Sequence, residues 1–306
     1  MKITILGSGT SHGIPCIACS CPVCLSKDSR DKRTRCSAFI ENKNKDGTTS
    51  HILIDIGPEF RIQALKNNIT AVDAVLLTHS HADHLHGLDD IRVFSHTVSR
   101  DHLKNPSAEN ARAVGIALYA NKRTLKDVKY RFDYIFKRTQ IGGGKPKLHL
   151  EDQTIFKRKM PPEFGDITIT PIPMIHGSLE TMGWLLTIHN EAGEKKSFAY
   201  LTDCSFISDK SIKKITECGG IVEHCVIDGL REKPHATHFS YLQAMETAEK
   251  IKSHHTWFTH ICHRKSHIQI QEYIARHLHD FPTLSRIVSD GGSVDAAYDG
   301  LVLIME

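Results

Sequence analysis

The chain has 306 residues, of which 40% are hydrophobic and 24% are charged, a composition typical of a globular protein with one large or two ordinary domains. Its formal net charge of +4 is too weak to predict a nucleic acid or a membrane surface as partner. No apolar run reaches the roughly 18 residues of a membrane span, and the first residues lack a signal-peptide pattern. The nine cysteines, an odd number, do not suggest a disulfide framework. We therefore expect a cytoplasmic protein.

Hydrophobic periodicity predicts strands and helices that alternate along the chain. Strands are predicted at residues 2–6, 36–41, 50–55, 72–77, 116–120, 167–175, 197–202, 256–259, 287–288 and 301–305. Helices are predicted at residues 59–67, 125–134 and 241–252. Residues 95–113 are polar and lack periodicity, which predicts an irregular insertion. No linker divides the chain, so we expect a single domain over residues 1–306.

The loop of residues 16–24 is rich in cysteine. Cys19, Cys21 and Cys24 form the pattern C-x-C-x-x-C, a spacing that allows three thiolates to surround one tetrahedral zinc ion. Such a site needs a fourth ligand, for which Cys16 is the nearest candidate and a distant histidine is the other. The alternative is a set of buried thiols or a redox pair.

The stretch Thr78–His84 follows the apolar run of residues 74–77 and contains His79, His81, Asp83 and His84. If the chain stays extended after the strand, His79 and His81 point the same way, because side chains alternate with period two. Asp83 and His84 then open the following helix and present a second pair. Two adjacent ligand pairs suit two metal ions, and imidazole with carboxylate suits Zn, Mn, Fe or Ni.

Three more metal-binding side chains follow strand-like runs in the second half of the chain. They are His176, Asp203 and His260, at the ends of the runs 167–175, 197–202 and 256–259. Proteins with alternating strands and helices usually place their active sites at the carboxyl ends of strands. We therefore expect these three side chains to meet the pairs of the Thr78–His84 stretch.

The motif H-x-H-x-D-H of residues 79–84 resembles the signature of the metallo-β-lactamase fold hydrolases. This resemblance implies an α/β fold, an αβ/βα sandwich of two mixed sheets flanked by helices. It also implies two metal ions about 3.5–4 Å apart, with a hydroxide held between them. One ion is assigned to His79, His81 and His176, the other to Asp83, His84 and His260, and Asp203 is assigned as the bridge between them.

Residues 228–231, 235–240 and 260–263, together with the cysteine loop, look like the PhnP-like phosphodiesterase branch of this family. The resemblance implies a structural zinc ion held by Cys19, Cys21, Cys24 and His263. It also implies that His238 lies near the leaving group and acts as general acid. A helix N-cap or a buried hydrogen-bonding histidine is the alternative for His238.

We therefore expect hydrolysis of small phosphodiesters, cyclic phosphates included, by an enzyme that uses His238 and Asp83 in catalysis. The expected cofactors are two divalent ions, Zn or Mn with Fe or Ni as alternatives, and one structural Zn. The expected partner is a small diester, with no membrane and no nucleic acid, and a homodimer is left open. The alternatives are a tRNA 3′-processing nuclease, a protein like those of PQQ biosynthesis, and a non-catalytic metal-binding protein.

Overall fold

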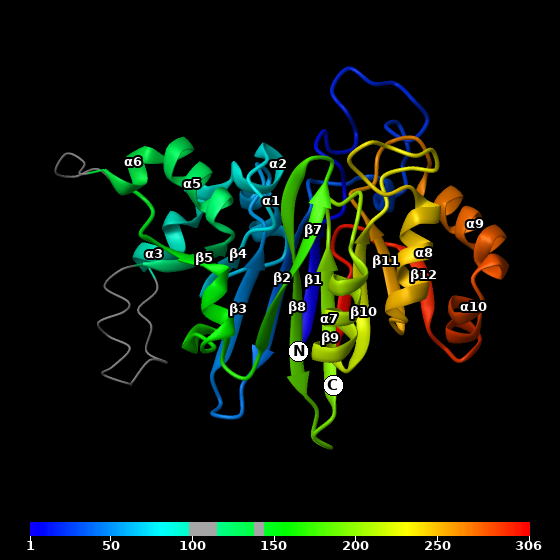
Figure 1. Cartoon of the computed structure of the whole chain (residues 1–306). Coiled ribbons are helices and arrows are strands. Elements are labelled where there is room, and N and C mark those ends of the chain that lie inside the picture. Colours follow the sequence, from blue (N-terminus) through cyan, green and yellow to red (C-terminus); the bar gives the residue numbers. More distant parts are fainter. Residues whose placement is uncertain (98–114, 138–143) are drawn as a thin grey trace.

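The computed structural model describes residues 1–97, 115–137 and 144–306, which form two facing β-sheets with helices on both outer faces (Figure 1). The first sheet has seven strands, in the order β13 (Val302–Ile304), β1 (Lys2–Gly7), β2 (Ser37–Lys43), β3 (Thr49–Ile54), β4 (Ala74–Leu76), β5 (Ile116–Ala120) and β6 (Leu148–Asp152). The second has six, in the order β12 (Ser293–Ala296), β11 (His255–Thr259), β10 (Ile221–Asp228), β9 (Lys195–Leu201), β8 (Leu179–His189) and β7 (Thr168–His176). Both sheets mix parallel and antiparallel pairs. The predicted αβ/βα sandwich is confirmed.

Helices cover the outer face of each sheet. Those on the first sheet are α1 (Phe60–Lys66), α2 (Ala82–Leu85), α3 (Arg92–Thr97), α5 (Lys122–Arg131) and α6 (Asp133–Phe136). Those on the second sheet are α7 (Asp209–Gly219), α8 (Tyr241–Ile251), α9 (His267–His277) and α10 (Pro282–Ser289). Among the described residues, no helix is both long and apolar enough to cross a bilayer.

Side-chain alternation along the strands explains the layers. On β3, Ile52 and Ile54 pack between the sheets, whereas Leu53 packs under the helices of the first sheet. On β9, Phe198 and Tyr200 pack between the sheets. Because both faces of these strands are buried toward their carboxyl ends, residues 52–54 and 198–201 are apolar throughout rather than alternating. This is why strands such as β9, in the second half of the chain, can be recognised in the sequence as hydrophobic runs.

One predicted strand is wrong. Residues 287–288 belong to helix α10, which begins at Pro282, a residue favoured in the first turn because its missing N–H would be unpaired there. Leu284 and Val288, four residues apart, both pack on the core of the second sheet, the spacing of one helix face. The predicted helix 125–134 also differs, since Phe132 separates α5 from α6.

The predicted insertion at residues 95–113 is described only in its first three residues, which end α3, and the remainder lies outside the described residues. The prediction of one domain over the whole chain stays a prediction.

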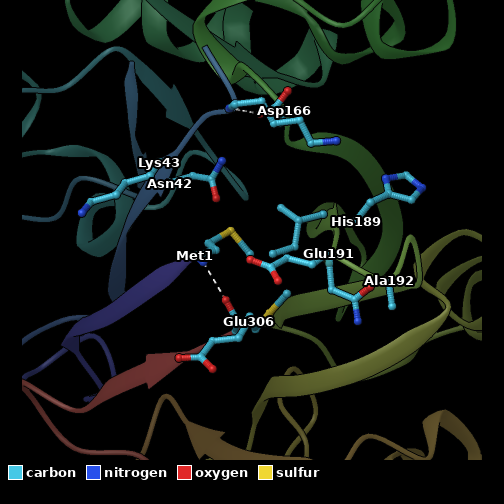
Figure 2. A pocket seen from close by; sticks show the side chains of 12 residues that line it. Met1, Asn42, Lys43, Asp166, His189, Glu191, Ala192 and Glu306 are labelled. Atoms are coloured by element: carbon cyan, nitrogen blue, oxygen red, sulfur yellow. Dashed lines mark hydrogen bonds between the residues drawn. The ribbon is translucent and has the colours of Figure 1, made fainter. Parts of the chain in front are cut away.

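The two ends of the sandwich differ in chemistry. The chain termini and the β8–β9 turn lie at one end, around a cavity of about 780 Å³ lined in part by Lys43, Asp166 and Glu306 (Figure 2). There the amino group of Met1 donates a hydrogen bond to the carbonyl of Met305. Among the described residues, no cluster with the spacing of metal ligands lines this cavity. The predicted ligands lie at the opposite end, where β4, β7, β9 and β11 finish.

Candidate dinuclear metal centre

Two groups of predicted metal ligands meet at the carboxyl ends of the strands, beside a third group with ligand spacing formed by Asp228, His238 and His260. The ligand atoms within each group all lie within 4.8 Å of one another. The first group is His79, His81, His176 and Asp203, and the second is Asp83, His84, His260 and Asp203. The structure therefore brings together all seven side chains predicted for the two ions, and Asp203 is common to both groups.

Distances around Asp203 show how the two groups share it. Its Oδ1 lies 3.2 Å from Nε2 of His84, and its Oδ2 lies 3.8 Å from Nε2 of His79 and 3.4 Å from Nε2 of His260. Asp83 Oδ2 lies 3.3 Å from Nε2 of His84 and 3.6 Å from Nε2 of His260. Both carboxylates thus face Nε2 of His84 and Nε2 of His260, and Asp203 also faces Nε2 of His79.

The other ring nitrogen of several of these histidines is already engaged. Nδ1 of His84 lies 2.8 Å from Asp55 Oδ2, and Nδ1 of His176 lies 2.6 Å from the carbonyl oxygen of Thr237. Such partners orient an imidazole and leave Nε2 for a metal. In the described part of the chain, Nε2 of His79, His84 and His260 is buried without a hydrogen-bond partner. Buried polar atoms normally have partners, so this donor set fits metal ions.

Electrostatics favour the same interpretation. Burial lowers the pKa of His79 well below its usual value and that of His176 to about 4, so both rings are neutral at neutral pH, the form that binds metals. Burial opposes protonation of His84 as well, but Asp203, Asp83 and Asp55 together raise its pKa well above the usual value. These carboxylates therefore favour a positive charge between them.

Backbone strain accompanies the site. Asp55, Asp203 and His260 each follow the end of a strand and have a positive φ, of 59°, 55° and 57° respectively. Residues other than glycine rarely adopt this conformation, and such strain persists mainly at functional sites. Gly57 has a different role, because a Cβ there would lie 2.2 Å from the carbonyl oxygen of Asp83. Only glycine permits this close approach of the β3–α1 loop to the metal-binding loop.

His238 lies beside the two groups. Its ring stacks on His260 with centroids 4.3 Å apart and contacts His176 edge-on at 4.5 Å. Its Nδ1 lies 2.7 Å from Oδ2 of Asp228, a fully buried residue at the end of β10. The same carboxylate oxygen accepts a hydrogen bond from the backbone N–H of Cys204. Asp228 therefore orients the ring of His238, and among the described residues no hydrogen bond engages its Nε2.

Sequence reasoning assigned no role to Asp55 or Asp228. Asp55 accepts hydrogen bonds from the backbone and hydroxyl of Thr78 and holds His84, so it supports the central loop. Both residues follow or end a strand, β3 and β10, in the same way that Asp203 follows β9. The rule that located Asp203, a carboxylate at the carboxyl end of a strand, could have found both.

A separate four-residue cluster lies at the N-terminal loop. The Sγ atoms of Cys19, Cys21 and Cys24 lie 3.3, 3.5 and 3.4 Å from Nδ1 of His263. Tetrahedral zinc with Zn–S of about 2.3 Å and Zn–N of about 2.0 Å separates S and N ligands by about 3.5 Å. His263 therefore lies where a fourth ligand would be, and Cys16 does not, since its Sγ donates to the carbonyl of Gly13. All nine cysteines are free thiols.

The thiols of this cluster differ in acidity. A hydrogen bond from the backbone N–H of Cys24 lowers the pKa of Cys21 to about 6, whereas burial raises the pKa of Cys24 to about 12. A cation is thus needed for both to be thiolates at neutral pH.

Backbone hydrogen bonds also join the N-terminal loop to the end of the sandwich that holds the metal-type ligands. Ile261 donates to the carbonyl of Ser8 and accepts from the N–H of Thr10, both at 3.0 Å. His260 and His263 flank this contact.

Elemental analysis tests the cysteine cluster apart from the other two groups. A variant carrying Asp203→Ala and His84→Ala is expected to keep about one Zn per chain, the number for one closed structural site. Adding Cys21→Ser should remove that ion, whereas Cys218→Ser, on α7 and outside the cluster, should not. A double variant free of zinc, or a disulfide within the cluster, would contradict the assignment.

Comparison with known proteins identifies the family. The model of the beta-lactamase superfamily domain matches residues 50–261. This chain belongs to that superfamily. The octanoyltransferase of Porphyromonas gingivalis is 34% identical over 295 residues, which are 95% of this chain and 52% of that protein. The chain thus spans about half the length of this curated relative.

Solved structures place the chain within the superfamily. A crystal structure of a diphosphatase from the PhnP family is 34% identical, with a TM-score of 0.74 over 100% of this chain and 98% of that one. Zinc-bound PqqB from Methylobacterium extorquens is 17% identical, with a TM-score of 0.68 over 100% of both chains, and shares the fold. The chain therefore belongs to the PhnP-like branch of the metallo-β-lactamase fold family, as predicted.

Proposed function

We propose that this protein hydrolyses small phosphodiesters at a centre of two divalent metal ions. The observation that carries the proposal is the position of Asp203 in two ligand groups at once, beside a buried histidine held by Asp228. One solved structure that is 34% identical to this chain is named a diphosphatase of the PhnP family, and that name supports a reaction at phosphorus.

The two ligand groups suit Zn or Mn, with Fe or Ni as alternatives. When bound, such ions polarise phosphoryl oxygens and lower the pKa of a water molecule that attacks phosphorus. Asp83 and Asp203 offset two of the four positive charges of a divalent pair. The remaining charge attracts an anionic ester.

His238 is the proton donor of the chain itself. Because its Nδ1 is held by Asp228, its Nε2 is the atom placed to donate a proton to the departing oxygen. Burial lowers the pKa of His238, which makes its protonated ring a stronger acid but a less populated one at neutral pH. Stacking on His260 keeps the ring beside the ligand groups, and it is only 9% exposed. Asp228 is a positioning residue, since it fixes which nitrogen faces the substrate. An N-cap role for His238 does not fit, because the N-cap of α8 is Ser240.

Three other functions have less support, and the last two of them are alternatives that the sequence left open. Octanoyl transfer is named for a protein of which this chain spans only 52%, and the site described here is built from metal-type ligands rather than from a free nucleophile. A tRNA nuclease would need an extended basic surface, which the weak net charge of +4 does not favour. A non-catalytic metal protein has no need for His238 and Asp228 beside the ions.

Turnover of bis(p-nitrophenyl) phosphate tests the proposal. Protein stripped with a chelator should be inactive, and Zn or Mn should restore hydrolysis of the diester. Pre-tRNA serves as the competing substrate and p-nitrophenyl phosphate as the monoester control. A metal-loaded, folded protein that cleaves pre-tRNA but no small diester, or cleaves neither, would overturn the proposal.

A further inference from the structure

A further set of side chains with metal-ligand spacing lies at the amino ends of two strands of the second sheet. Glu223, His254 and His255 each offer one ligand atom, and these atoms lie within 4.8 Å of one another. Glu223 is the third residue of β10, and His255 begins β11, which runs parallel to β10. His260 follows the other end of β11, five residues from His255, which is roughly 16 Å along a strand. The set is therefore separate from the dinuclear centre.

Local irregularity in the backbone brings these residues together. The pairing of β10 with β9 shifts register between Val222 and His224, so Glu223 is the extra residue of a β-bulge. A bulge re-aims the side chain that it carries and is frequent beside functional sites. His254 is held on both sides, because its N–H donates to the carbonyl of Val222 at 2.9 Å and its carbonyl accepts from Ser293 at 3.0 Å. The backbone that carries the set is thus fixed by the sheet.

Hydrogen bonds within the set orient its ligand atoms. Nδ1 of His254 lies 3.0 Å from Oε1 of Glu223, close to the separation of two neighbouring ligands on one ion with bonds of about 2.0–2.2 Å. Nδ1 of His255 lies 3.0 Å from Oγ of Ser293, a partner that orients the ring and leaves Nε2 for a cation. The two rings are 4.4 Å apart, centroid to centroid. His224 is not a ligand, because both of its ring nitrogens have other partners.

The charge state of the set suits a cation. Burial lowers the pKa of His255 below its usual value, so this ring is neutral at neutral pH, the form that binds metals. Burial opposes ionisation of Glu223, but the hydrogen bond with His254 and the charge of Lys196 outweigh it and lower the pKa of the carboxyl. Lys196 lies 3.8 Å from Oε2, so Oε1 is the oxygen that faces His254. One carboxylate and two imidazoles form a donor set for borderline ions such as Zn.

We infer that Glu223, His254 and His255 bind one divalent cation of the borderline class, at a site apart from the dinuclear centre and the cysteine cluster. The ion would join β10 and β11 at their amino ends. The side chain of His254 is 41% exposed, so water completes the coordination and the site is weaker than the enclosed cysteine cluster. It empties when free metal is removed, and protein freed of excess metal therefore carries ions only at the other sites.

Calorimetric titration of the zinc-loaded protein with Zn²⁺, after removal of excess metal, tests the inference. The native protein is expected to bind one further equivalent with a Kd of about 1–100 µM. The His254→Gln/His255→Gln variant should bind one equivalent less. Glu223→Gln should bind that equivalent at least about tenfold more weakly, because it loses the charged ligand. With free zinc at 100 times Kd, Tm of the native protein should rise by about 5 °C, and Tm of the double variant should not.

The control removes two histidines elsewhere, through His149→Gln and His279→Gln, and should keep the extra equivalent. Each of these histidines pairs with one carboxylate, and neither belongs to a group with ligand spacing among the described residues. If the His254→Gln/His255→Gln variant proves misfolded by circular dichroism, Glu223→Gln decides the matter. A native protein that binds no further zinc, a folded double variant that binds it unchanged, or an unchanged Kd in Glu223→Gln would overturn the inference.

Discussion

Replacing Asp203 by alanine is expected to abolish hydrolysis of phosphodiesters, with a loss of at least about 10³-fold in kcat/KM. The reason is geometric: Asp203 is the one side chain common to both ligand groups among the described residues, and it lies within 3.8 Å of the Nε2 atoms of His79, His84 and His260. Its removal takes a ligand from each ion at once. Rates with saturating Zn or Mn, together with bound metal per chain, provide the measurement.

The fold should tolerate this change. Asp203 is buried in a polar site at a strand end rather than in one of the hydrophobic cores, and circular dichroism is expected to be unchanged. Asp209→Ala, an exposed carboxylate at the start of α7, is the matched control and should keep full activity. An Asp203→Ala protein that retains native turnover would reject the assignment of the bridging ligand.

His238→Ala is expected to lower turnover by about 10²–10⁴-fold for esters with poor leaving groups, the usual effect of losing a general acid. The site should keep its two ions, because His238 belongs to neither predicted ligand group and has ligand spacing only with Asp228 and His260; bound metal per chain is measured alongside. The loss should shrink for p-nitrophenyl esters, since p-nitrophenolate departs without a proton. His189→Ala, an exposed histidine at the opposite end of the sandwich, is the control.

A series of diesters with leaving groups of rising pKa separates the two roles that His238 can have. Proton donation predicts a rate loss that grows along the series. A role restricted to holding the phosphate predicts the same loss for each ester. Equal losses across the series would therefore reject acid catalysis by His238.

Much of the fold was predictable because burial on both faces makes strands continuous hydrophobic runs. Strand β5 was placed at its observed residues, and most other predicted strands differ by only a few residues at either end. Strands β6, β8, β10 and β12 were not predicted, although β8 and β10 are largely buried. The prediction of a strand at 287–288 is wrong because these two β-branched residues belong to a longer segment whose four-residue apolar spacing is that of a helix.

The candidate site was predictable for a different reason. Each ligand follows a hydrophobic run, and the carboxyl ends of those strands meet at one end of the sandwich. Among 21 histidines, only this placement separates His176 and His260 from the others. The hydrogen bonds of Asp55 to Thr78 and of Asp228 to His238 depend on side-chain directions in three dimensions. The choice of His263 over Cys16 as fourth ligand also depends on the three-dimensional structure, because His263 lies 239 or more residues after the three cysteines in sequence.

Anomalous diffraction from crystals of the metal-loaded protein tests the dinuclear centre most directly. We expect three peaks per chain, one of them at the cluster of Cys19, Cys21, Cys24 and His263. Of the other two, one should be bound by His79, His81 and His176 and one by Asp83, His84 and His260, with Asp203 bound to both. A single peak or none among those seven residues, with the cysteine site filled, would contradict the account.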